Sequence, residues 1–272
     1  MADSVLWLLG DPPIQIDPAT PVVRADDLGM SRGQSVFETL RVAGGKARFV
    51  EPHLARLARS AARVDVDLPP GWEQLVTRAV ASYALPDGVL RLTCTKGGAA
   101  WAIVTPVPAA TVAQRELGVS AVLLQLGVPA GLRAEAPWLL GGVKSTSYAV
   151  NMATIRAAHE LGADEAVWTS SDGFVLEAPT STVVWVTDGR LVTPDPADVG
   201  TLRGTTLDVV AGLVDIEVRR GTVEELRAAS EVALLSSVRG VAPVTSLDGV
   251  RLTAGRVVSG LGELFEAALL RG

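Results

Sequence analysis

Lys144 stands in a stretch of sequence that suits amine chemistry. It follows Gly-Gly-Val at 141–143 and precedes Ser-Thr-Ser at 145–147, so its neighbours leave room for a bulky group. Three of the 24 basic residues are lysines (Lys46, Lys96 and Lys144), and the other 21 are arginines. A guanidinium stays protonated and cannot act as a primary amine. Since apolar surroundings free the lone pair of a lysine for Schiff-base formation, Lys144 is a candidate catalytic residue.

Two later stretches could bind an aromatic group and an anion. Glu177 ends the predicted strand Phe-Val-Leu-Glu, where a carboxylate could keep a pyridinium nitrogen protonated. Thr205 and Thr206 open a predicted helix after Leu-Arg-Gly, and free N–H groups and hydroxyls at that point favour an anion. Taken alone, Glu177 also fits an edge strand facing water, and the threonines also fit an ordinary helix N-terminus.

Hydrophobic periodicity and turn residues predict the elements that must position these side chains. Paired glycines and Asp-Gly pairs are typical of tight hairpin turns, and an apolar period of 3.6 residues is typical of helices. The predicted hairpins span 35–50, 164–177 and 181–194. The other predicted strands span 89–95, 102–107 and 119–125. The predicted helices begin at 51 and 206 and span 72–83, 149–161 and 257–269.

The helix that begins at Glu51 has an apolar stripe. Helical spacing predicts that this stripe is buried and that Arg56, Arg59 and Arg63 lie off it. The apolar residues of the stripe are Leu54, Leu57, Ala58, Ala61 and Ala62. On this pattern alone, Arg56 is expected to face away from the core.

Composition excludes several classes of protein. Of the 272 residues, 48% are apolar and 20% are charged, which excludes general disorder. A net charge of −6 argues against a nucleic-acid-binding protein with a broad basic face. One cysteine and two histidines exclude a disulfide framework and leave little material for a metal site. With no apolar run of ~20 residues and no basic leader, we expect a cytoplasmic protein that neither spans a membrane nor binds a metal.

The order of strands and helices predicts an α+β fold rather than a regularly alternating sheet. The Pro- and Ala-rich stretch from Pro106 to Gln114 is the expected linker between domains. We therefore expect a smaller N-terminal α/β domain at 1–112 and a larger C-terminal domain at 113–272 that carries Lys144. No Gly-x-Gly-x-x-Gly or Walker sequence supports a dinucleotide or nucleotide triphosphate site.

Several motifs in order resemble the class IV aminotransferase family, the fold type IV group of pyridoxal phosphate enzymes. The resemblance covers residues 26–243. It rests on GQSVFETLRV (33–42), HLARLARSA (53–61), GGVKSTSYAVNMA (141–153), GADEAVWTSSDGFVLEAPTSTVVWV (162–186), LVTP (191–194) and LRGTT (202–206). It implies two α/β domains with pyridoxal 5'-phosphate between them, and a homodimer that completes each site.

The resemblance also implies the residues that hold the cofactor ring. Lys144 matches the lysine that forms the Schiff base, and Glu177 matches the partner of the pyridine nitrogen. Leu202 matches the leucine that packs beneath the ring. Tyr148 is expected near the ring hydroxyl.

The phosphate is expected to bind a second group of residues. Arg56, in His-Leu-Ala-Arg-Leu, matches the family's phosphate-binding arginine, whose fork suits a phosphate better than a lysine would. Thr205 and Thr206 match residues whose amides and hydroxyl bind the same phosphate. Ser237 falls where the family has a further phosphate contact.

The family contains branched-chain aminotransferases, D-amino acid transaminases and 4-amino-4-deoxychorismate lyases. The lyases place a threonine at the position of Thr39, where a hydroxyl can help deliver a proton to the leaving group. The whole pattern, including KSTSYAVNMA (144–153) and STVVW (181–185), resembles actinobacterial lyases of folate biosynthesis most. Arg41 and Lys96 are the expected contacts of the substrate carboxylates. Glu38 is shared with both types of transaminase and so does not distinguish a lyase from a transaminase. The alternatives are a D-amino acid or branched-chain transaminase and a non-catalytic scaffold, which the retained Lys144 disfavours.

Overall fold

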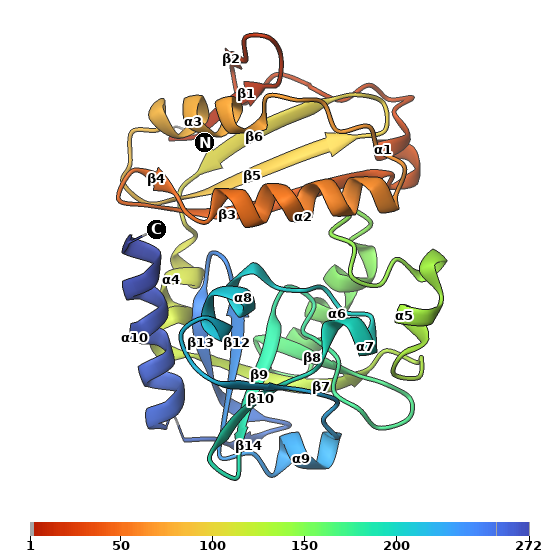
Figure 1. The fold of residues 1–272 in the computed structure, drawn as a ribbon, viewed down its shortest axis with the longest axis vertical. Coiled ribbons are helices and arrows are strands. Elements are labelled where there is room, and N and C mark those ends of the chain that lie inside the picture. The colour runs from red at the N-terminus through yellow and green to blue at the C-terminus, as the bar shows by residue number, and fades with distance from the viewer. Residues whose placement is uncertain (1–2, 254, 272) are drawn as a thin grey trace. The chain divides into compact units, whose positions relative to one another are not determined.

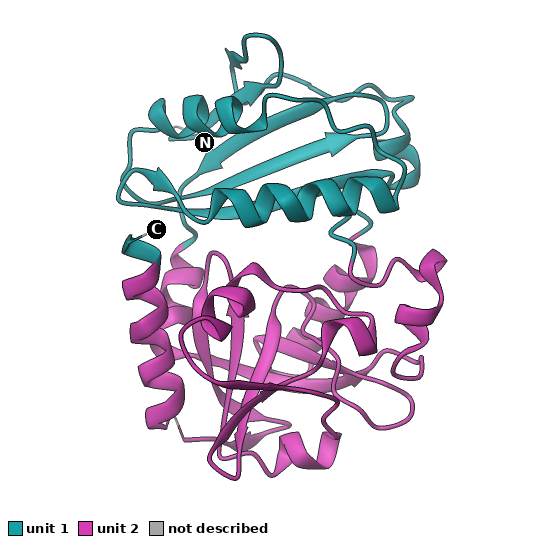
Figure 2. Ribbon diagram, viewed as in Figure 1, with its two compact units in different colours: residues 1–108, 143–147, 269–272 teal, residues 109–142, 148–268 magenta. Residues whose placement is uncertain are grey.

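The computed structural model describes residues 3–253 and 255–271 and divides into two compact units (Figures 1 and 2). Unit 1 comprises residues 1–108, 143–147 and 269–272, and unit 2 comprises 109–142 and 148–268. The expected boundary after residue 112 instead lies at Pro108, and the short segment with Lys144 packs in unit 1. Each unit combines a sheet with helices, which confirms the predicted α+β class. Within residues 3–253 and 255–271, no helix is long and apolar enough to cross a bilayer.

Unit 1 is built on an antiparallel sheet of order β2-β1-β6-β5-β3-β4. Its strands are β1 (Val5–Leu8), β2 (Ile14–Ile16), β3 (Ser35–Ala43), β4 (Lys46–Ala47), β5 (Gly88–Thr95) and β6 (Ala100–Thr105). Its helices are α1 (Leu28–Arg32), α2 (Val50–Arg63) and α3 (Trp72–Ala81). Helix α2 packs along β3, and α3 packs against β1 and β6 (Figure 1).

The strands of unit 1 have one fully buried face. Successive side chains of a strand point to opposite faces of the sheet. On β3, Glu38 and Leu40 point toward α2, and their cross-strand neighbours on β5, Leu92 and Leu90, lie on the same face. All four side chains are inaccessible to solvent. The opposite face of β3 carries Phe37, Thr39 and Arg41.

Helix α2 departs from the stripe expected of it. Its buried residues are His53, Arg56, Leu57, Ser60 and Ala61. The expectation was wrong for Ala58 and Ala62, which are exposed, and for Arg56, which is buried. The reason is that α2 covers Glu38, and a buried carboxylate requires polar partners on the helix above it.

Unit 2 is built on a mixed sheet of order β11-β10-β9-β12-β13-β7-β8, with β14 paired to β13. The strands are β7 (Val119–Gln125), β8 (Glu165–Thr169), β9 (Thr182–Thr187), β10 (Arg190–Thr193), β11 (Ile216–Val218), β12 (Glu231–Ser236), β13 (Gly240–Leu247) and β14 (Val250–Arg251). The helices are α4 (Ala109–Leu117), α5 (Leu132–Glu135), α6 (Ala149–Glu160), α7 (Pro196–Val199), α8 (Thr205–Ala211), α9 (Val223–Arg227) and α10 (Arg256–Arg271), with a 3-10 turn at Pro137–Leu139. Trp185 belongs to the hydrophobic core of this unit and is fully buried.

Turn residues predicted the hairpins correctly, with one difference. Asp188 and Gly189 both have positive φ, 48° and 73°, as a primed turn between β9 and β10 requires. After the turn at Gly173, the returning arm pairs with β8, since Leu176 donates its N–H to Trp168 and Trp168 donates to Glu177, but the pairing amounts to an isolated bridge between Thr169 and Val175 rather than a regular strand. The expected linker was also wrong in part, since residues from Ala109 onward form α4.

Candidate functional site

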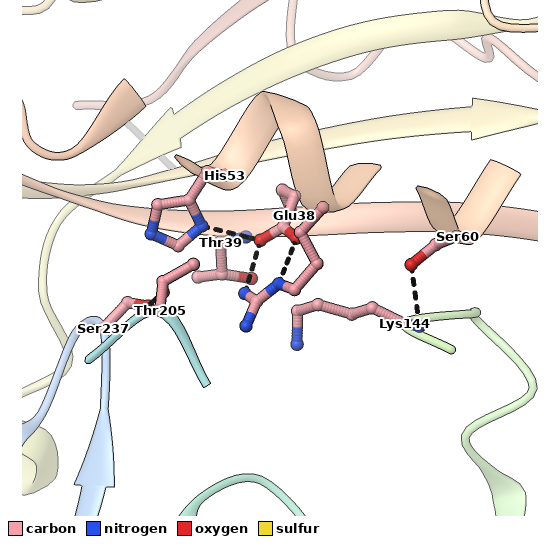
Figure 3. A network of polar contacts seen from close by, with 8 residues as sticks. Glu38, Thr39, His53, Ser60, Lys144, Thr205 and Ser237 are labelled. Atoms are coloured by element: carbon pink, nitrogen blue, oxygen red, sulfur yellow. Dashed lines mark hydrogen bonds and ion pairs between the residues drawn. The ribbon is translucent and has the colours of Figure 1, made fainter. Parts of the chain in front are cut away.

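Lys144 is held by backbone hydrogen bonds to unit 1. The N–H of Phe37 donates to the carbonyl of Lys144 at 3.1 Å, and the N–H of Thr146 donates to the carbonyl of Ser35 at 3.0 Å. The N–H of Lys144 donates to Oγ of Ser60 on α2 at 3.2 Å, as Figure 3 shows. The segment therefore extends the sheet along the free edge of β3, which fixes where the lysine side chain begins.

The side chain of Lys144 lies against an aromatic ring. Its Nζ is 4.3 Å from the centroid of Phe37, and the guanidinium carbon of Arg91 is 4.1 Å from the same centroid. A cation over a ring face is attracted by the ring quadrupole. In the register of the sheet, Arg91 lies directly opposite Thr39, which shares its face with Phe37. Lys144 and Arg91 thus both lie against the Phe37 ring, on the face of β3 that carries Thr39.

Beneath α2, three polar side chains are buried together. Glu38 accepts hydrogen bonds from Arg56 Nε at 2.7 Å, from Arg56 Nη2 at 2.8 Å and from His53 Nδ1 at 2.7 Å (Figure 3). Glu38 is 0% exposed, His53 1% and Arg56 5%. The arginine is therefore held by a fork of two parallel hydrogen bonds, and the histidine braces the carboxylate from another direction.

The pKa values of this cluster follow from its contacts. Burial raises the pKa of Glu38, but hydrogen bonds and charge from Arg56 and His53 outweigh burial and hold it at about 2. Burial lowers the pKa of His53, and the positive charges of Arg56 and Lys144 lower it further against the opposing effect of Glu38. Near neutral pH the cluster is an ionised carboxylate, a guanidinium and a neutral imidazole, with Lys144 within electrostatic reach.

The two expected carboxylate contacts, Arg41 and Lys96, have different surroundings. Arg41 is buried on the same face of β3 as Thr39. Lys96 is half-buried, and its Nζ donates to Asp65 at 2.8 Å. This hydrogen bond to the Asp65 carboxylate raises the pKa of Lys96. Lys96 is thus engaged by a carboxylate of its own unit, whereas Arg41 lies on the face that holds Lys144.

In unit 2, the carboxylate of Glu177 is held from two sides. Oε1 accepts a hydrogen bond from Arg133 Nη1 at 3.2 Å, and Oε2 accepts one from the backbone N–H of Leu202 at 3.1 Å. Glu177 and Leu202, expected at the nitrogen and beneath the ring, are therefore neighbours. Tyr148 is connected to the same region, because its hydroxyl donates to the carbonyl of Pro179 at 3.4 Å.

The expected phosphate contacts of unit 2 also meet. Oγ1 of Thr205, the first residue of α8, lies 3.3 Å from Oγ of Ser237 in the turn between β12 and β13 (Figure 3). Thr205 and Thr206 are buried, and the preceding Gly204 has no side chain with which to cap the helix. Two hydroxyls and the first N–H groups of a helix gather here, which is a donor set for an anion.

Sequence reasoning did not assign several residues of these clusters. Glu38 was read as uninformative, and His53, Ser60, Arg91 and Arg133 had no expected role. Only His53 carried a signal, as one of two histidines in the chain and a helical neighbour of Arg56. In the part of the chain that the structure describes, no group of three or more His, Cys, Asp or Glu side chains could hold a metal ion.

Comparison with known proteins gives a consistent picture. The family model for "Amino-transferase class IV" matches residues 35–247. A bifunctional aminodeoxychorismate lyase / D-amino acid transaminase of Mycobacterium tuberculosis is 39% identical over 94% of this chain and 96% of its own. A D-alanine aminotransferase of Bacillus licheniformis is 30% identical, with 86% of each chain covered.

Solved structures agree with these sequence relatives. A hypothetical aminotransferase from M. tuberculosis in its PLP-bound form superposes with a TM-score of 0.91 at 39% identity, covering 98% of this chain and 99% of that one. A fold IV-transaminase, CpuTA1, from Curtobacterium pusillum superposes with a TM-score of 0.89 at 34% identity, covering 96% and 99%. The similarity therefore extends over both units.

Proposed function

The chain belongs to the class IV aminotransferase family, and from this premise we propose that it is a 4-amino-4-deoxychorismate lyase of folate biosynthesis, releasing pyruvate and leaving 4-aminobenzoate. The observation that carries the proposal is the 39% identity, over 94% of the chain, to a relative named as a lyase as well as a transaminase. The position of Thr39 on the face of β3 that holds Lys144 supports it.

The side chains present fit the family's cofactor, pyridoxal 5'-phosphate. Unit 1 supplies an amine for the aldehyde at Lys144 and a guanidinium for the phosphate at Arg56. Unit 2 supplies a carboxylate for the ring nitrogen at Glu177 and hydroxyls for the phosphate at Thr205 and Ser237. When bound, the cofactor supplies an electron sink that stabilises negative charge on the substrate carbon.

Lys144 is the proposed catalytic base. Its Nζ would hold the cofactor through the aldehyde and, when free, would remove a proton from the substrate carbon. The hydrogen bonds to Phe37 and Ser60 hold the lysine backbone at the edge of β3. With the backbone fixed in this way, the Nζ lies beside the Phe37 ring, where it would accept the proton.

Glu177 is proposed to accept the hydrogen bond of the protonated ring nitrogen, and Leu202 to pack beneath the ring. The hydrogen bonds from Arg133 and from the Leu202 N–H fix the orientation of the Glu177 carboxylate. Arg56, Thr205, Thr206 and Ser237 are proposed to bind the phosphate, and Tyr148 to lie near the ring hydroxyl.

Thr39 is proposed as the residue that makes the reaction a lyase. Its hydroxyl would pass a proton to the departing enolpyruvyl group, which leaves as pyruvate while the ring becomes aromatic. Thr39 and Phe37 are two residues apart on one face of β3, and the Nζ of Lys144 lies over the Phe37 ring. The proton donor and the base thus share one face of the sheet. Arg41, on this face, is the proposed contact of a substrate carboxylate, with Lys96 a second.

A D-amino acid transaminase is the second candidate. It has support in the relatives, because the M. tuberculosis protein is named as bifunctional and the Listeria and Bacillus relatives are named D-alanine aminotransferases. In this reaction Lys144 would deliver the abstracted proton to the cofactor carbon, and no group would be eliminated from the substrate. Both activities can reside in one site, since the first proton transfer is common to them.

One assay with purified holoenzyme tests the proposal. Pyruvate release from 4-amino-4-deoxychorismate is measured beside the conversion of D-alanine and branched-chain amino acids with 2-oxoglutarate. We expect pyruvate and 4-aminobenzoate to form in equal amounts. Brisk transamination with no pyruvate from aminodeoxychorismate would overturn the lyase assignment in favour of the transaminase.

We also propose that the enzyme is a homodimer, as the resemblance implies. The face of the unit 1 sheet opposite α2 carries the half-buried apolar residues Trp101 and Ile103, in register with Phe37 and Thr39. A partner subunit would cover such a face. Light scattering on the purified protein should give twice the mass of the chain, and a monomer at micromolar concentration would contradict it.

A further inference from the structure

Stability by itself does not explain why Glu38, His53 and Arg56 are buried together. Removing charged groups from water costs several kcal/mol per ion in effective terms, and apolar replacements of a buried ion pair are often as stable. Leu40 and Leu92 beside Glu38 show that this layer of unit 1 accepts apolar side chains. The retained cluster therefore points to a role other than holding α2 on the sheet.

We propose that Glu38 and His53 are positioning residues that fix the guanidinium of Arg56 for the cofactor phosphate. This inference rests on the proposed role of Arg56 as a phosphate ligand. It gives Glu38 and His53 a function in cofactor affinity without any contact of their own with the cofactor.

The atoms engaged by Glu38 define which edge of Arg56 is presented. The carboxylate takes the side edge of the planar guanidinium, Nε and Nη2, at 2.7 and 2.8 Å. The end edge, made by Nη1 and the outer hydrogen of Nη2, therefore points away from Glu38. Two parallel N–H groups on that edge match two oxygens of a phosphate. Because the guanidinium is planar, fixing one edge fixes the direction of the other.

His53 fixes the carboxylate in turn. Oε2 of Glu38 accepts from Arg56 Nη2 and from His53 Nδ1, so rotation of the carboxylate would break both bonds. An ionised carboxylate only accepts hydrogen bonds, so Nδ1 must carry the proton of the neutral imidazole. His53 and Arg56 lie three residues apart on α2, and one helix face thus supplies both donors.

Glu38 and His53 fix the orientation of the Arg56 guanidinium but do not add to its positive charge. The ionised Glu38 offsets the positive charge of Arg56, so it weakens the long-range attraction of the guanidinium for a phosphate. Glu38 therefore raises the affinity for a phosphate only if fixing the direction of the Arg56 N–H groups stabilises the bound phosphate by more than this loss of attraction. In Glu38→Gln, the amide NH₂ group faces an N–H of Arg56 in either orientation, because both oxygens of Glu38 accept from Arg56; the fork is broken without a change in the shape of the side chain.

The test compares two ligands of the apoprotein, pyridoxal 5'-phosphate and pyridoxal. Both react with Lys144 through the same aldehyde, so the ratio of their dissociation constants isolates the phosphate contribution. We expect Arg56→Ala and Glu38→Gln each to lower this preference for the phosphorylated ligand about tenfold. The double variant should be no worse than Arg56→Ala alone, because residues of one network are not additive.

Matched variants separate positioning from general damage. Glu231→Gln alters another buried carboxylate, which accepts from the N–H of Val258 at the start of α10, and should leave the ratio unchanged. His53→Leu should lower the ratio, whereas His53→Asn, which retains a donor close to the place of Nδ1, should restore most of it. The two His53 variants also provide the test if Glu38→Gln does not fold.

The outcomes distinguish a failure of the positioning role of Glu38 and His53 from a failure of the proposed phosphate-binding role of Arg56. A ratio that falls in Arg56→Ala but changes less than about fivefold in Glu38→Gln would overturn the positioning role and leave Arg56 as phosphate ligand. A ratio equally low in His53→Leu and His53→Asn would also remove His53 from the proposal. An unchanged ratio in Arg56→Ala would overturn the phosphate assignment and the inference with it.

Discussion

The backbone N–H of Phe37 donates to the carbonyl of Lys144 at 3.1 Å, and the Nζ of Lys144 lies 4.3 Å from the centroid of the Phe37 ring. One residue of β3 therefore holds both ends of the lysine, although 107 positions separate the two residues in the sequence. The backbone bond sets where the side chain starts, and the ring sets where the amine lies. A short segment of chain thereby acquires the rigidity of a sheet, which a catalytic base requires.

Lys144→Ala should abolish turnover and remove the yellow absorbance near 420 nm, because no other amine can bond to the cofactor at this position. Borohydride reduction of the wild-type holoenzyme should label one peptide, which contains Lys144. Lys46→Ala, at the exposed tip of the β3–β4 hairpin, is the control and should remain yellow and active. A label on Lys46 or Lys96 would contradict the assignment.

Glu177→Gln should retain the cofactor but slow turnover by at least ~30-fold, which corresponds to ~2 kcal/mol of transition-state stabilisation. The reason is that a neutral amide no longer keeps the ring nitrogen protonated. Arg133→Gln should slow turnover less, since it removes only one of the partners of Glu177. Glu225→Gln, which breaks a similar pair with Arg219, is the control. Equal activity of all three variants would place Glu177 outside the site.

Thr39→Val should separate the two reactions. It keeps the shape of the side chain but removes the hydroxyl, so lyase turnover should fall ~100-fold or more if the hydroxyl transfers a proton. Half-transamination with an amino acid, followed as loss of the 420 nm band, should fall much less. Thr93→Val alters the buried threonine opposite Phe37 and controls for packing. Equal losses of both activities in Thr39→Val would show that Thr39 only packs in the sheet.

Glu38 should make the stability of the protein sensitive to acid. Its pKa is about 2 in the folded chain against an ordinary value of 4.5. A lowered carboxyl pKa contributes stability that is fully present above pH 4.5 and is lost as the pH falls toward 2. Urea unfolding of wild type and Glu38→Gln should therefore show a difference in free energy that is largest near neutral pH and shrinks below pH 4.5. A difference independent of pH would mean that Glu38 is not ionised in its buried position.

Cys94 should be inert in the native protein. Burial, with the charges of Asp27 and Asp67, raises the pKa of its thiol to about 11, and the side chain is inaccessible to solvent. Because the thiolate is the reactive form, a thiol reagent at pH 8 should not react with folded protein in the time needed to modify unfolded protein completely. Unfolding in urea should release one reactive thiol per chain. Rapid modification of the folded protein would show that β5 opens readily.

The sequence by itself was sufficient wherever the controlling interaction is local. Asp188-Gly189 and Gly44-Gly45 predict tight turns because positive φ is cheap at those residues, and the turns are present. The helix at 149–161 ends where Gly162 takes a positive φ. The order of the motifs was also sufficient to identify the family, because residue types and their spacing can be read from the sequence without knowledge of any distance in the structure.

The surroundings of the candidate site were decided only by the tertiary structure. Helical periodicity considers only the apolar residues of the helix itself. It therefore predicted that Arg56 faces solvent, since it contains no information about an ion-pair partner on another element. That partner, Glu38, lies on β3, and its burial brings Arg56 onto the face that α2 turns inward, beside Leu57 and Ala61 of the predicted stripe. The same holds for Lys144, whose position depends on a hydrogen bond to a strand formed a hundred residues earlier. Long-range pairs of this kind leave no period in the sequence, because a buried charge is stable only once its partner is in place.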